Sequence, residues 1–476
     1  MNNFNDKFNE ECAVVGVIGD SEASNFCYLG LYAMQHRGQE GAGIVSSDDS
    51  SIYAHRDMGL VADIFNENNL KDLKGNKAIG HSRYATCGAK DWRNLQPLVA
   101  ENSQNTFSIA HNGNLINSDE IREQLEEKGA IFSTSSDTEV ILHLVAQATK
   151  QKSISKKLLT ALKQVKGAYS LAVLTHDALY AVRDPAGVRP LSLGKLGDQS
   201  YIVASETCAF DLVGAEFVRD IEPGEILKIS KDGSMKSEFV EKKSLKAFCV
   251  FEYVYFSRPD SQLNGKSVYN VRKRLGVELA KEKPADVDLV IPVPDSGVSA
   301  AIGYSQELGV PFELGLVRNH YVGRTFIEPK QSIRDFGVKI KLNPNKGLFE
   351  GKRIAVVDDS IVRGTTCKKL VSLLRDAGAK EVHFRISSPP TKNSCYYGID
   401  TPSKDELIAC THSVADIKEY ILADSLGYLS IEGMYRAVKG KRENHCDACF
   451  SSEYRVGKPS MCSIRTGSQC NKPKTL

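Results

Sequence analysis

The chain has 476 residues, of which 41% are hydrophobic and 25% charged, so its length predicts two folded domains rather than one. The formal net charge of +2 gives no electrostatic reason to expect a nucleic acid or a membrane surface as a partner. No apolar stretch approaches the roughly 20 residues of a membrane span, and residues 1–11 are polar and acidic, unlike a secretory signal. We therefore expect a cytoplasmic protein whose twelve cysteines serve thiol chemistry or metal binding rather than disulfides.

In the N-terminal half, short apolar strands alternate with Gly/Asn turns, and two helical stretches lie between them. This pattern predicts an α+β sandwich. The expected strands are Cys12–Ile18, Ala78–His81, Thr106–Ala110 and Ser170–Leu174, and the expected helices are Phe26–Met34 and Thr138–Ala148.

The C-terminal half has strands that are each followed by a helical segment, as the βαβ units of a parallel α/β sheet require. The expected strands are Asp288–Val293, Arg353–Val357 and Val382–Ile386. We place the seam in the charged stretch 237–246. The expected division is thus a leader of residues 1–11, a first domain of residues 12–245 and a second of residues 246–476.

The most informative run of the second half is 354–366, Ile-Ala-Val-Val-Asp-Asp-Ser-Ile-Val-Arg-Gly-Thr-Thr. An apolar strand ends at Asp358 and Asp359, and a small Gly/Thr-rich loop then leads into a helix. Ligands bind at this edge of open α/β sheets, and N–H groups at a helix N-terminus hold phosphates. Carboxylates there suit ribose hydroxyls and Mg²⁺. The run predicts a site for a sugar phosphate with a metal-bound diphosphate, although the acidic pair alone would fit a solvated turn.

This run resembles the phosphoribosylpyrophosphate (PRPP) loop of phosphoribosyltransferases. The resemblance implies that the ribose lies at Asp358 and Asp359. It implies that the 5-phosphate lies in the loop that contains Ser360, Arg363, Gly364, Thr365 and Thr366. Some transcription regulators keep such a loop without catalysis, so the rest of the chain must decide the reaction.

Cys12 opens a strand directly after the polar leader, where a lone cysteine would ordinarily be a small core residue. Motifs follow at 35–40 (Gln-His-Arg-Gly-Gln-Glu), 80–86 (Gly-His-Ser-Arg-Tyr-Ala-Thr), 111–115 (His-Asn-Gly-Asn-Leu) and 136–139 (Ser-Asp-Thr-Glu). Together they resemble the glutaminase domain of N-terminal-nucleophile amidotransferases, a four-layer α+β sandwich. The resemblance implies that residues 1–11 are a cleaved propeptide. The Cys12 thiolate would then attack glutamine, and its free α-amine, with a pKa of roughly 7.7–8.0, would act as base.

The same resemblance assigns the residues around the nucleophile. The Asn112 side chain and the Gly113 N–H would form the oxyanion hole. Arg83 would pair with the substrate α-carboxylate, and Asp137 would hold its ammonium. Taken singly, Arg83 could form a surface salt bridge and Asn112-Gly113 a tight turn, but the set of motifs favours a glutamine site.

A glutaminase domain joined to a PRPP loop resembles the glutamine PRPP amidotransferase family, from Cys12 to about Phe450. The resemblance implies that ammonia released at Cys12 attacks C1 of PRPP. The products would be 5-phosphoribosylamine, glutamate and diphosphate, in the first committed step of purine synthesis. It further implies Mg²⁺ near Ser296, Asp358 and Asp359, a loop carrying Arg324 that closes over PRPP, a homotetramer, and inhibition by purine nucleotides.

The pair Cys446-Asp-Ala-Cys449 has a spacing typical of metal ligands, and two sets of four cysteines contain it. Cys462 and Cys470 would complete a local zinc site. Cys249 and Cys395 would complete a set that spacing does not single out. Resemblance to the family branch with a cleaved leader and a [4Fe–4S] cluster implies this second set, which we expect. We interpret the others as packing or surface residues: Cys27, Cys87, Cys208, Cys367 and Cys410.

Two other functions share part of these features. One is a glutaminase-linked enzyme with a different acceptor, such as a sugar phosphate, and the run at 354–366 argues against it. The other is a PRPP-binding regulator without catalysis, and the intact glutaminase set argues against that.

Overall fold

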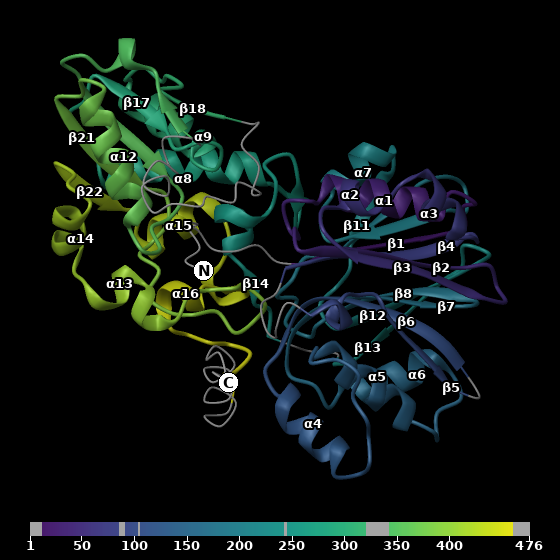
Figure 1. Ribbon diagram of the computed structural model, residues 1–476. Helices are drawn as coiled ribbons and strands as arrows, with labels where there is room; N and C mark the ends of the chain where they lie inside the picture. The colour runs from purple at the N-terminus through teal and green to yellow at the C-terminus, as the bar shows by residue number, and fades with distance from the viewer. Residues whose placement is uncertain (1–11, 85–90, 103–104, 242–244, 320–341, 460–476) are drawn as a thin grey trace, which may run out of the picture.

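The computed structural model describes residues 12–84, 91–102, 105–241, 245–319 and 342–459. These residues form two bodies side by side, the N-terminal half in purple to blue and the C-terminal half in green to yellow (Figure 1). No helix in the described ranges is long and apolar enough to cross a membrane.

Two antiparallel sheets stack face to face in the N-terminal domain. The first has seven strands in the order β11-β9-β10-β1-β4-β2-β3, and the second has six in the order β13-β12-β8-β7-β6-β5. The first sheet contains β1 (Ala13–Ile18), β2 (Gly41–Ser47), β3 (Ile52–Met58), β4 (Lys77–Arg83), β9 (Ser192–Lys195), β10 (Tyr201–Ala204) and β11 (Glu216–Asp220). The second contains β5 (Leu98–Asn102), β6 (Asn105–Leu115), β7 (Gly167–Thr175), β8 (Ala178–Arg183), β12 (Glu225–Ser230) and β13 (Met235–Phe239).

Helices cover both outer faces of this pair of sheets, so the domain has four layers (Figure 1). One layer holds α1 (Ala23–Ala33), α2 (Val61–Ile64), α3 (Glu67–Asp72) and α7 (Cys208–Val213). The other holds α4 (Ser118–Glu126), α5 (Thr138–Gln147) and α6 (Ile154–Leu162). Strand β1 is apolar on both faces because Val14 and Ile18 pack between the sheets, whereas Val15 and Val17 pack in the core under α1. The expected four-layer α+β sandwich is confirmed.

Strand β6 runs five residues beyond the expected end at Ala110. An Asn-Gly pair usually marks a turn, yet Asn112 pairs with Ser170 and Gly113 with Tyr169 in the ladder with β7. The motif at 111–115 therefore lies in a buried strand rather than in a loop. The other expected strands and both expected helices occur with shifts of a few residues at their ends.

The C-terminal domain is built on a parallel sheet in the order β17-β20-β21-β22, as expected for a phosphoribosyltransferase-type α/β fold. Its strands are β17 (Leu289–Pro292), β20 (Arg353–Asp358), β21 (Glu381–Ile386) and β22 (Ser425–Tyr428). Its helices are α8 (Val268–Glu282), α9 (Val298–Leu308), α12 (Thr365–Asp376), α13 (Ile408–Thr411), α14 (Val414–Tyr420), α15 (Ile431–Val438) and α16 (Ala448–Ser451). Two small ribbons, β15 (Gln262–Leu263) with β16 (Lys266–Ser267) and β18 (Leu316–Arg318) with β19 (Leu342–Pro344), lie outside this sheet.

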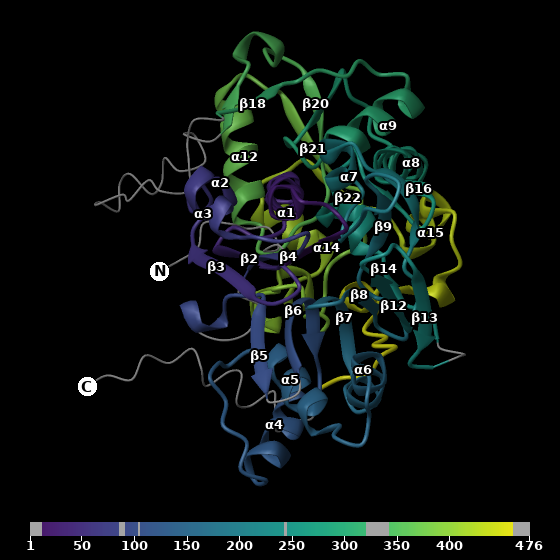
Figure 2. The same ribbon diagram turned by 90° about the vertical axis from the view of Figure 1, so that its right-hand side faces the viewer.

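The segment 247–250 joins the two domains. Strand β14 (Phe248–Cys249) pairs in parallel with β23 (His445–Cys446) near the end of the described chain. On the other side, the N–H groups of Ala247 and Cys249 donate to the carbonyls of Ala186 and Val188. Strand β14 thus lies where the two halves meet (Figures 1 and 2). The exact domain boundary between residues 245 and 246 stays a prediction.

Candidate functional site

The acidic pair lies at the carboxyl edge of the parallel sheet. Asp358 ends β20, and both it and Asp359 are almost completely buried. The Ser360 hydroxyl donates to Asp359 Oδ1 at 2.6 Å, and the Ser388 hydroxyl, which follows β21, donates to the Asp359 carbonyl at 2.7 Å. The ends of two neighbouring strands therefore hold this pair in place.

The loop after β17 packs against the same edge. The Val293 N–H donates to the Val357 carbonyl at 2.8 Å. Gly297 approaches that oxygen so closely that a Cβ would lie 2.3 Å from it, so only glycine fits. Ser296 immediately precedes this glycine. The structure therefore brings Ser296 to the strand end that carries Asp358.

The loop after the acidic pair enters α12 through Gly364, whose φ of 76° is left-handed. A Cβ here would meet side chains of Ile408 and Tyr420 at 3.1 and 3.3 Å, so α13 and α14 border the loop. Thr365 and Thr366 form the first turn of α12, where N–H groups can receive an anion. The two arginines expected to bind PRPP stay predictions. The Arg363 guanidinium bonds outward to Glu406 at 2.9 Å, and Arg324 lies outside the described residues.

Cys12 stands directly before β1, whose first residue pairs with Ser82 of β4. The Cys12 thiol donates to the Tyr84 carbonyl at 3.7 Å, and Tyr84 follows Arg83, the last residue of β4. A neighbouring β1 residue, Val14, donates its N–H to the Ser205 hydroxyl at 3.0 Å. The strand pairing therefore places Cys12 close to Arg83.

Asn112 is fully buried in β6 and reaches towards β1. Its Nδ2 lies 3.5 Å from the Ser205 hydroxyl, the group that also binds the Val14 N–H. Its Oδ1 has no hydrogen-bond partner among the described residues. A buried amide with an unsatisfied end is costly unless a ligand meets it. The next residue, Gly113, has a φ of 142°, and a Cβ there would lie 2.1 Å from the Ala168 carbonyl.

The two residues expected to bind the charged ends of the substrate come from different elements: Arg83 ends β4, and Asp137 directly precedes α5. Arg83 is 6% exposed, and its Nη1 donates to the Asp91 carbonyl at 3.2 Å. Asp137 accepts a hydrogen bond of 2.9 Å from the Leu115 N–H, two residues beyond Gly113. The position of Asp137 is therefore tied to the strand that carries the expected oxyanion residues.

His111 belongs to the motif at 111–115, but the motif alone assigns it no role. Its Nδ1 lies 3.0 Å from the Thr138 hydroxyl and 3.7 Å from Asp137 Oδ1. Burial alone would raise the pKa of Asp137, but His111 and the N–H groups of Leu115 and Thr138 hold that pKa below its ordinary value. His111 thus keeps the Asp137 carboxylate charged. Its place between the Asn-Gly pair and Asp137 could be found only from the fold.

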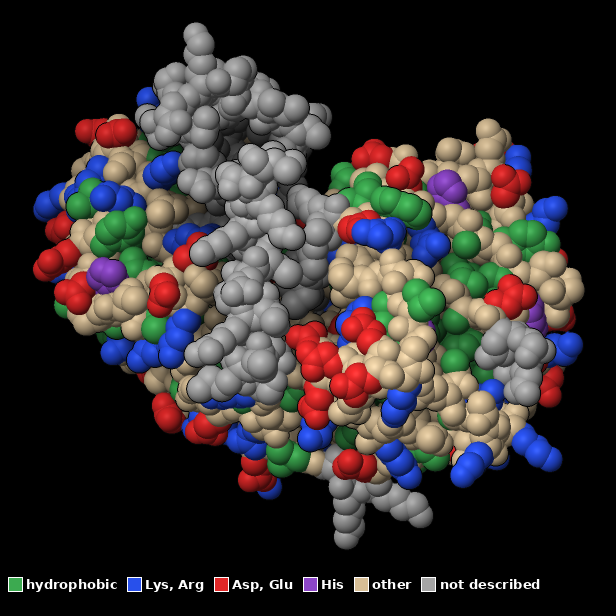
Figure 3. All heavy atoms as spheres, turned by 60° about the horizontal axis from the view of Figure 1, so that its bottom comes forward, with side chains coloured by type: hydrophobic (Ala, Val, Ile, Leu, Met, Phe, Trp, Pro, Cys, Tyr) green, Lys and Arg blue, Asp and Glu red, His purple; other side chains and the backbone are tan. Residues whose placement is uncertain are grey.

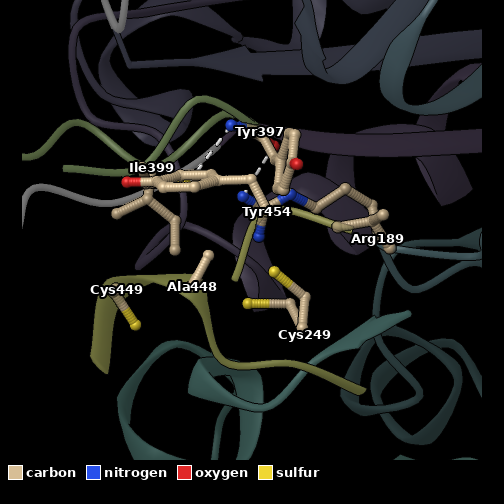
Figure 4. A pocket seen from close by; sticks show the side chains of 10 residues that line it. Arg189, Cys249, Tyr397, Ile399, Ala448, Cys449 and Tyr454 are labelled. Carbon is tan, nitrogen blue, oxygen red and sulfur yellow. Dashed lines mark hydrogen bonds between the residues drawn. The ribbon is translucent and has the colours of Figure 1, made fainter. Parts of the chain in front are cut away.

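Four cysteines from distant parts of the chain line one cavity between the domains, together with Arg189, Tyr397 and Tyr454. They are Cys249, Cys395, Cys446 and Cys449. Figure 4 shows the Cys449 sulfur pointing from α16 towards the side on which Cys249 lies. Burial raises the pKa of Cys449 well above its ordinary value, and the charges of the other three sulfurs raise it further. The four thiols are therefore close enough to interact.

The cavity that these cysteines line is partly open to solvent. Its empty space is about 320 Å³, open solvent at its mouth included. Among the described residues, no group of three or more His, Cys, Asp or Glu side chains is arranged to hold a metal ion. Four converging thiols with space between them suit a larger, polynuclear group. The alternative zinc set cannot be compared, because Cys462 and Cys470 lie outside the described residues.

A buried group of charges joins the domains beside this cavity, and the sequence did not predict it. Arg37, from the motif at 35–40, pairs with both Glu206 and Glu252, and Glu252 Oε1 also lies 3.3 Å from Arg189 Nη1. These four side chains are at most 1% exposed. Burial alone would raise the pKa of Glu252, but Arg37 and Arg189 hold it below its ordinary value. The neighbouring cations likewise lower the pKa of Glu206, so both carboxylates stay charged.

Basic and acidic side chains are interspersed over much of the face in Figure 3. Acidic side chains gather near its centre, and the exposed residues of α4 and its end include Asp119, Glu120, Glu123, Glu126 and Glu127. This face therefore offers no continuous basic surface of the kind that nucleic-acid backbones attract.

Comparison with known proteins links both sites to one enzyme family. Residues 81–211 match the glutamine amidotransferase domain, and residues 263–408 match the phosphoribosyl transferase domain. "Amidophosphoribosyltransferase 1, chloroplastic" of Arabidopsis thaliana is 52% identical, over 97% of this chain and 81% of the relative. The Bacillus subtilis amidophosphoribosyltransferase is 48% identical, over 94% of each protein.

Solved structures agree with these relatives. One, described as the allosteric regulatory enzyme of purine biosynthesis, has a TM-score of 0.92 at 46% identity, covering 98% of this chain and 100% of that one. Another, the glutamine PRPP amidotransferase of B. subtilis complexed with ADP and GMP, has a TM-score of 0.89 at 47% identity, covering 93% of this chain and 97% of that one. With two matching domains and such identity along nearly its whole length, the chain belongs to the amidophosphoribosyltransferase family.

Proposed function

We propose that the amidophosphoribosyltransferase reaction is divided between two edges of this molecule. Ammonia is released from glutamine at Cys12 in the N-terminal domain, and PRPP binds at the carboxyl edge of the parallel sheet, where Asp358 lies. The single observation that supports this division is that Cys12 and Arg83 lie at the paired strands β1 and β4, and Asn112 lies on β6 of the sheet that stacks on them. An amide-cleaving site and a PRPP loop in one chain account for both halves of the reaction.

In the glutamine half, Cys12 Sγ attacks the amide carbon after residues 1–11 are removed and its α-amine takes the proton. Arg83 binds the substrate carboxylate and Asp137 binds its ammonium. Asn112 and the Gly113 N–H receive the charge that develops on the amide oxygen. The geometry of the Asn112 donor supports this role, because its Nδ2 makes only a long contact of 3.5 Å with the Ser205 hydroxyl and can turn to an oxyanion.

In the PRPP half, the α12 N-terminus with Ser360, Thr365 and Thr366 receives the 5-phosphate, and Asp358 and Asp359 bind the ribose hydroxyls. Arg363 and Arg324 complete the expected PRPP set, although Arg363 would first have to leave Glu406. The oxygen donors of Ser296, Asp358 and Asp359 fit Mg²⁺, which would neutralise the diphosphate as it leaves C1. Ammonia displaces diphosphate at C1, which gives 5-phosphoribosylamine.

The cavity cysteines fit a [4Fe–4S] cluster, which needs four thiolates. Cys249, Cys395, Cys446 and Cys449 would hold it. Because these ligands come from three separate stretches of sequence, the cluster would cross-link the segment that joins the domains to residues 395 and 446–449. We infer a structural role for it rather than a place in either half-reaction.

We also propose that the enzyme works in the cytoplasm as a homotetramer and is inhibited by purine nucleotides. The B. subtilis relative complexed with ADP and GMP supports the nucleotide part.

The decisive experiment separates the ammonia sources. We expect Cys12→Ser to lose glutamine-dependent product formation by at least about 10³-fold, as removal of a nucleophile does elsewhere. Activity with added ammonium salts should largely survive because the PRPP edge is untouched. Cys410→Ser, at a half-buried cysteine on α13 of the C-terminal domain, is the matched control for the glutamine-dependent activity. Intact mass should show active protein beginning at Cys12; full activity with residues 1–11 retained would contradict the nucleophile assignment.

The cluster has its own test. Anaerobically purified protein should be brown and contain iron and sulfide, because thiolate-bound iron absorbs visible light. Cys249→Ser should remove the colour and lower the unfolding temperature of the C-terminal domain, whereas Cys462→Ser should change neither. The reverse result would establish the local zinc set of Cys446, Cys449, Cys462 and Cys470.

A further inference from the structure

A loop of the C-terminal domain contacts the expected oxyanion residue of the N-terminal domain. Gly398 has a φ of 109°, and a Cβ there would lie 2.9 Å from both Cα and the carbonyl carbon of Gly113. Cβ atoms essentially never approach backbone that closely, so Gly398 can carry no side chain without moving one of the two segments. The two glycines are 285 residues apart in sequence.

A second contact fixes the position of this loop along strand β6. The Asn114 amide Nδ2 donates to the Tyr396 carbonyl at 3.1 Å. The residue that follows Gly113 on β6 is therefore hydrogen-bonded to the loop, two residues before Gly398. Gly113 itself cannot retreat, because a Cβ at its position would already lie 2.1 Å from the Ala168 carbonyl on β7. The backbone of Gly113 is confined between β7 and the loop.

The loop is anchored by buried charge and by the cysteine cavity. The Tyr397 carbonyl accepts hydrogen bonds from Arg189 Nε and Nη2 at 2.9 and 2.8 Å, and Arg189 is paired with Glu252. The Tyr397 hydroxyl donates to the Gly457 carbonyl at 2.7 Å. Three residues before Gly398, Cys395 lines the cysteine cavity. Gly398 is thus held by two independent sets of contacts that both involve the interface between the domains.

We propose that Gly398 is a positioning residue for the glutaminase reaction and fixes the backbone of Gly113 from the other domain. The inference rests on the proposed role of the Gly113 N–H in the oxyanion hole. An N–H donor stabilises the developing charge only when it lies at about 2.7–3.1 Å from the place that the oxygen will occupy. A loop that presses on the Gly113 Cα sets that distance without touching glutamine. The C-terminal domain, including its cysteine cavity, thereby supports catalysis in the N-terminal domain.

The test is Gly398→Ala, which adds the one carbon that the contact excludes. We expect kcat for glutamine hydrolysis to fall about 10- to 100-fold with little change in the glutamine KM, because Arg83 and Asp137 are not displaced. Ammonia-dependent activity should stay within about twofold. The rate at which iodoacetamide alkylates Cys12 should also stay, since displacement of iodide at a CH₂ carbon needs no oxyanion hole.

Gly129→Ala is the matched control. Gly129 also has a left-handed φ, 86°, and a Cβ there would meet nothing within 4 Å, so the variant carries similar backbone strain without the contact. Unchanged glutamine kcat in Gly398→Ala, with the fold retained, would overturn the inference. Equal losses of glutamine hydrolysis, ammonia-dependent activity and alkylation would also overturn it, because they would indicate general unfolding. Failure of the proposed function is distinct: in that case wild-type protein alkylated at Cys12 would still hydrolyse glutamine.

Discussion

The proposed PRPP site comes from one continuous run of sequence, whereas the proposed glutamine site is assembled from separate strands and is contacted by the other domain. Between residues 354 and 366, a strand, an acidic pair and a helix N-terminus follow one another directly. At the glutamine edge, Cys12, Arg83 and Asn112 come from different strands, and Gly113 is contacted by residue 398. The two sites therefore depend differently on the rest of the fold.

The two sites should respond differently when contacts elsewhere in the molecule change. A site on one strand–loop–helix unit keeps its geometry as long as that unit is folded. A site assembled from several strands and the neighbouring domain loses its geometry when any supporting contact shifts. We therefore expect perturbations at the interface to impair glutamine use more than ammonia use.

The largest effect is expected from breaking the charge group at the interface. Glu252→Gln leaves Arg37 and Arg189 without the carboxylate between them, and all three side chains are at most 1% exposed. Removing one partner of a buried pair costs about 3–5 kcal/mol. We expect that decrease in the free energy of unfolding, and a greater loss of glutamine-dependent than of ammonia-dependent activity, because Arg189 also anchors Tyr397.

The control for this prediction is an ion pair of similar geometry on the surface. Glu278 pairs with Arg436 at 2.6 Å, but the arginine is 51% exposed, and such pairs contribute about 0–1 kcal/mol. Urea unfolding of Glu278→Gln should show a correspondingly small change. If the two variants lost equal stability, the interface charges would be no more important than surface ones.

The next effect concerns the PRPP edge alone. Asp358→Asn or Asp359→Asn removes a charged acceptor for ribose or metal, worth about 1.5–3 kcal/mol, so we expect kcat/KM for PRPP to fall about 10- to 100-fold. Alkylation of Cys12 by iodoacetamide should keep its rate, because the strands around Cys12 are untouched. Asp198→Asn, an exposed position with the same change in charge, is the control. PRPP kinetics identical to wild type in both variants would refute the assignment.

The sequence predicted the contiguous parts of the molecule well and the assembled parts only in outline. The strand at 353–358 and the helix after Gly364 follow from apolar periodicity and loop composition, which are local signals. The α+β and α/β classes follow from the order of such elements. The predicted end of β6 was too early, because Asn112-Gly113 has the composition of a turn. The strand continues to Leu115 because these residues pair with β7. Glu252 and Gly398 carry no local signal, since their importance lies in contacts with residues hundreds of positions away.

The smallest effect is a pH dependence at the glutamine edge. Because His111 and two N–H groups hold the pKa of Asp137 below its ordinary value, its charged form stabilises the folded state. This contribution is complete above the unfolded pKa of about 3.9 and is lost as pH falls through the lower folded value. Asp137→Asn keeps an acceptor for the Leu115 N–H but not the charge, so it should lower the free energy of unfolding by about 1 kcal/mol at pH 7.

The difference between Asp137→Asn and wild type should shrink as urea unfolding is repeated at pH values from 5 down to below 4. The glutamine KM of the variant should rise at pH 7, because the carboxylate that ties down the strand is also the expected partner of the substrate ammonium. Asp119→Asn, exposed on α4, should show neither change. A stability difference that stayed constant across this pH range would mean that the charge of Asp137 does not hold β6 and that the glutamine edge relies on the interface contacts alone.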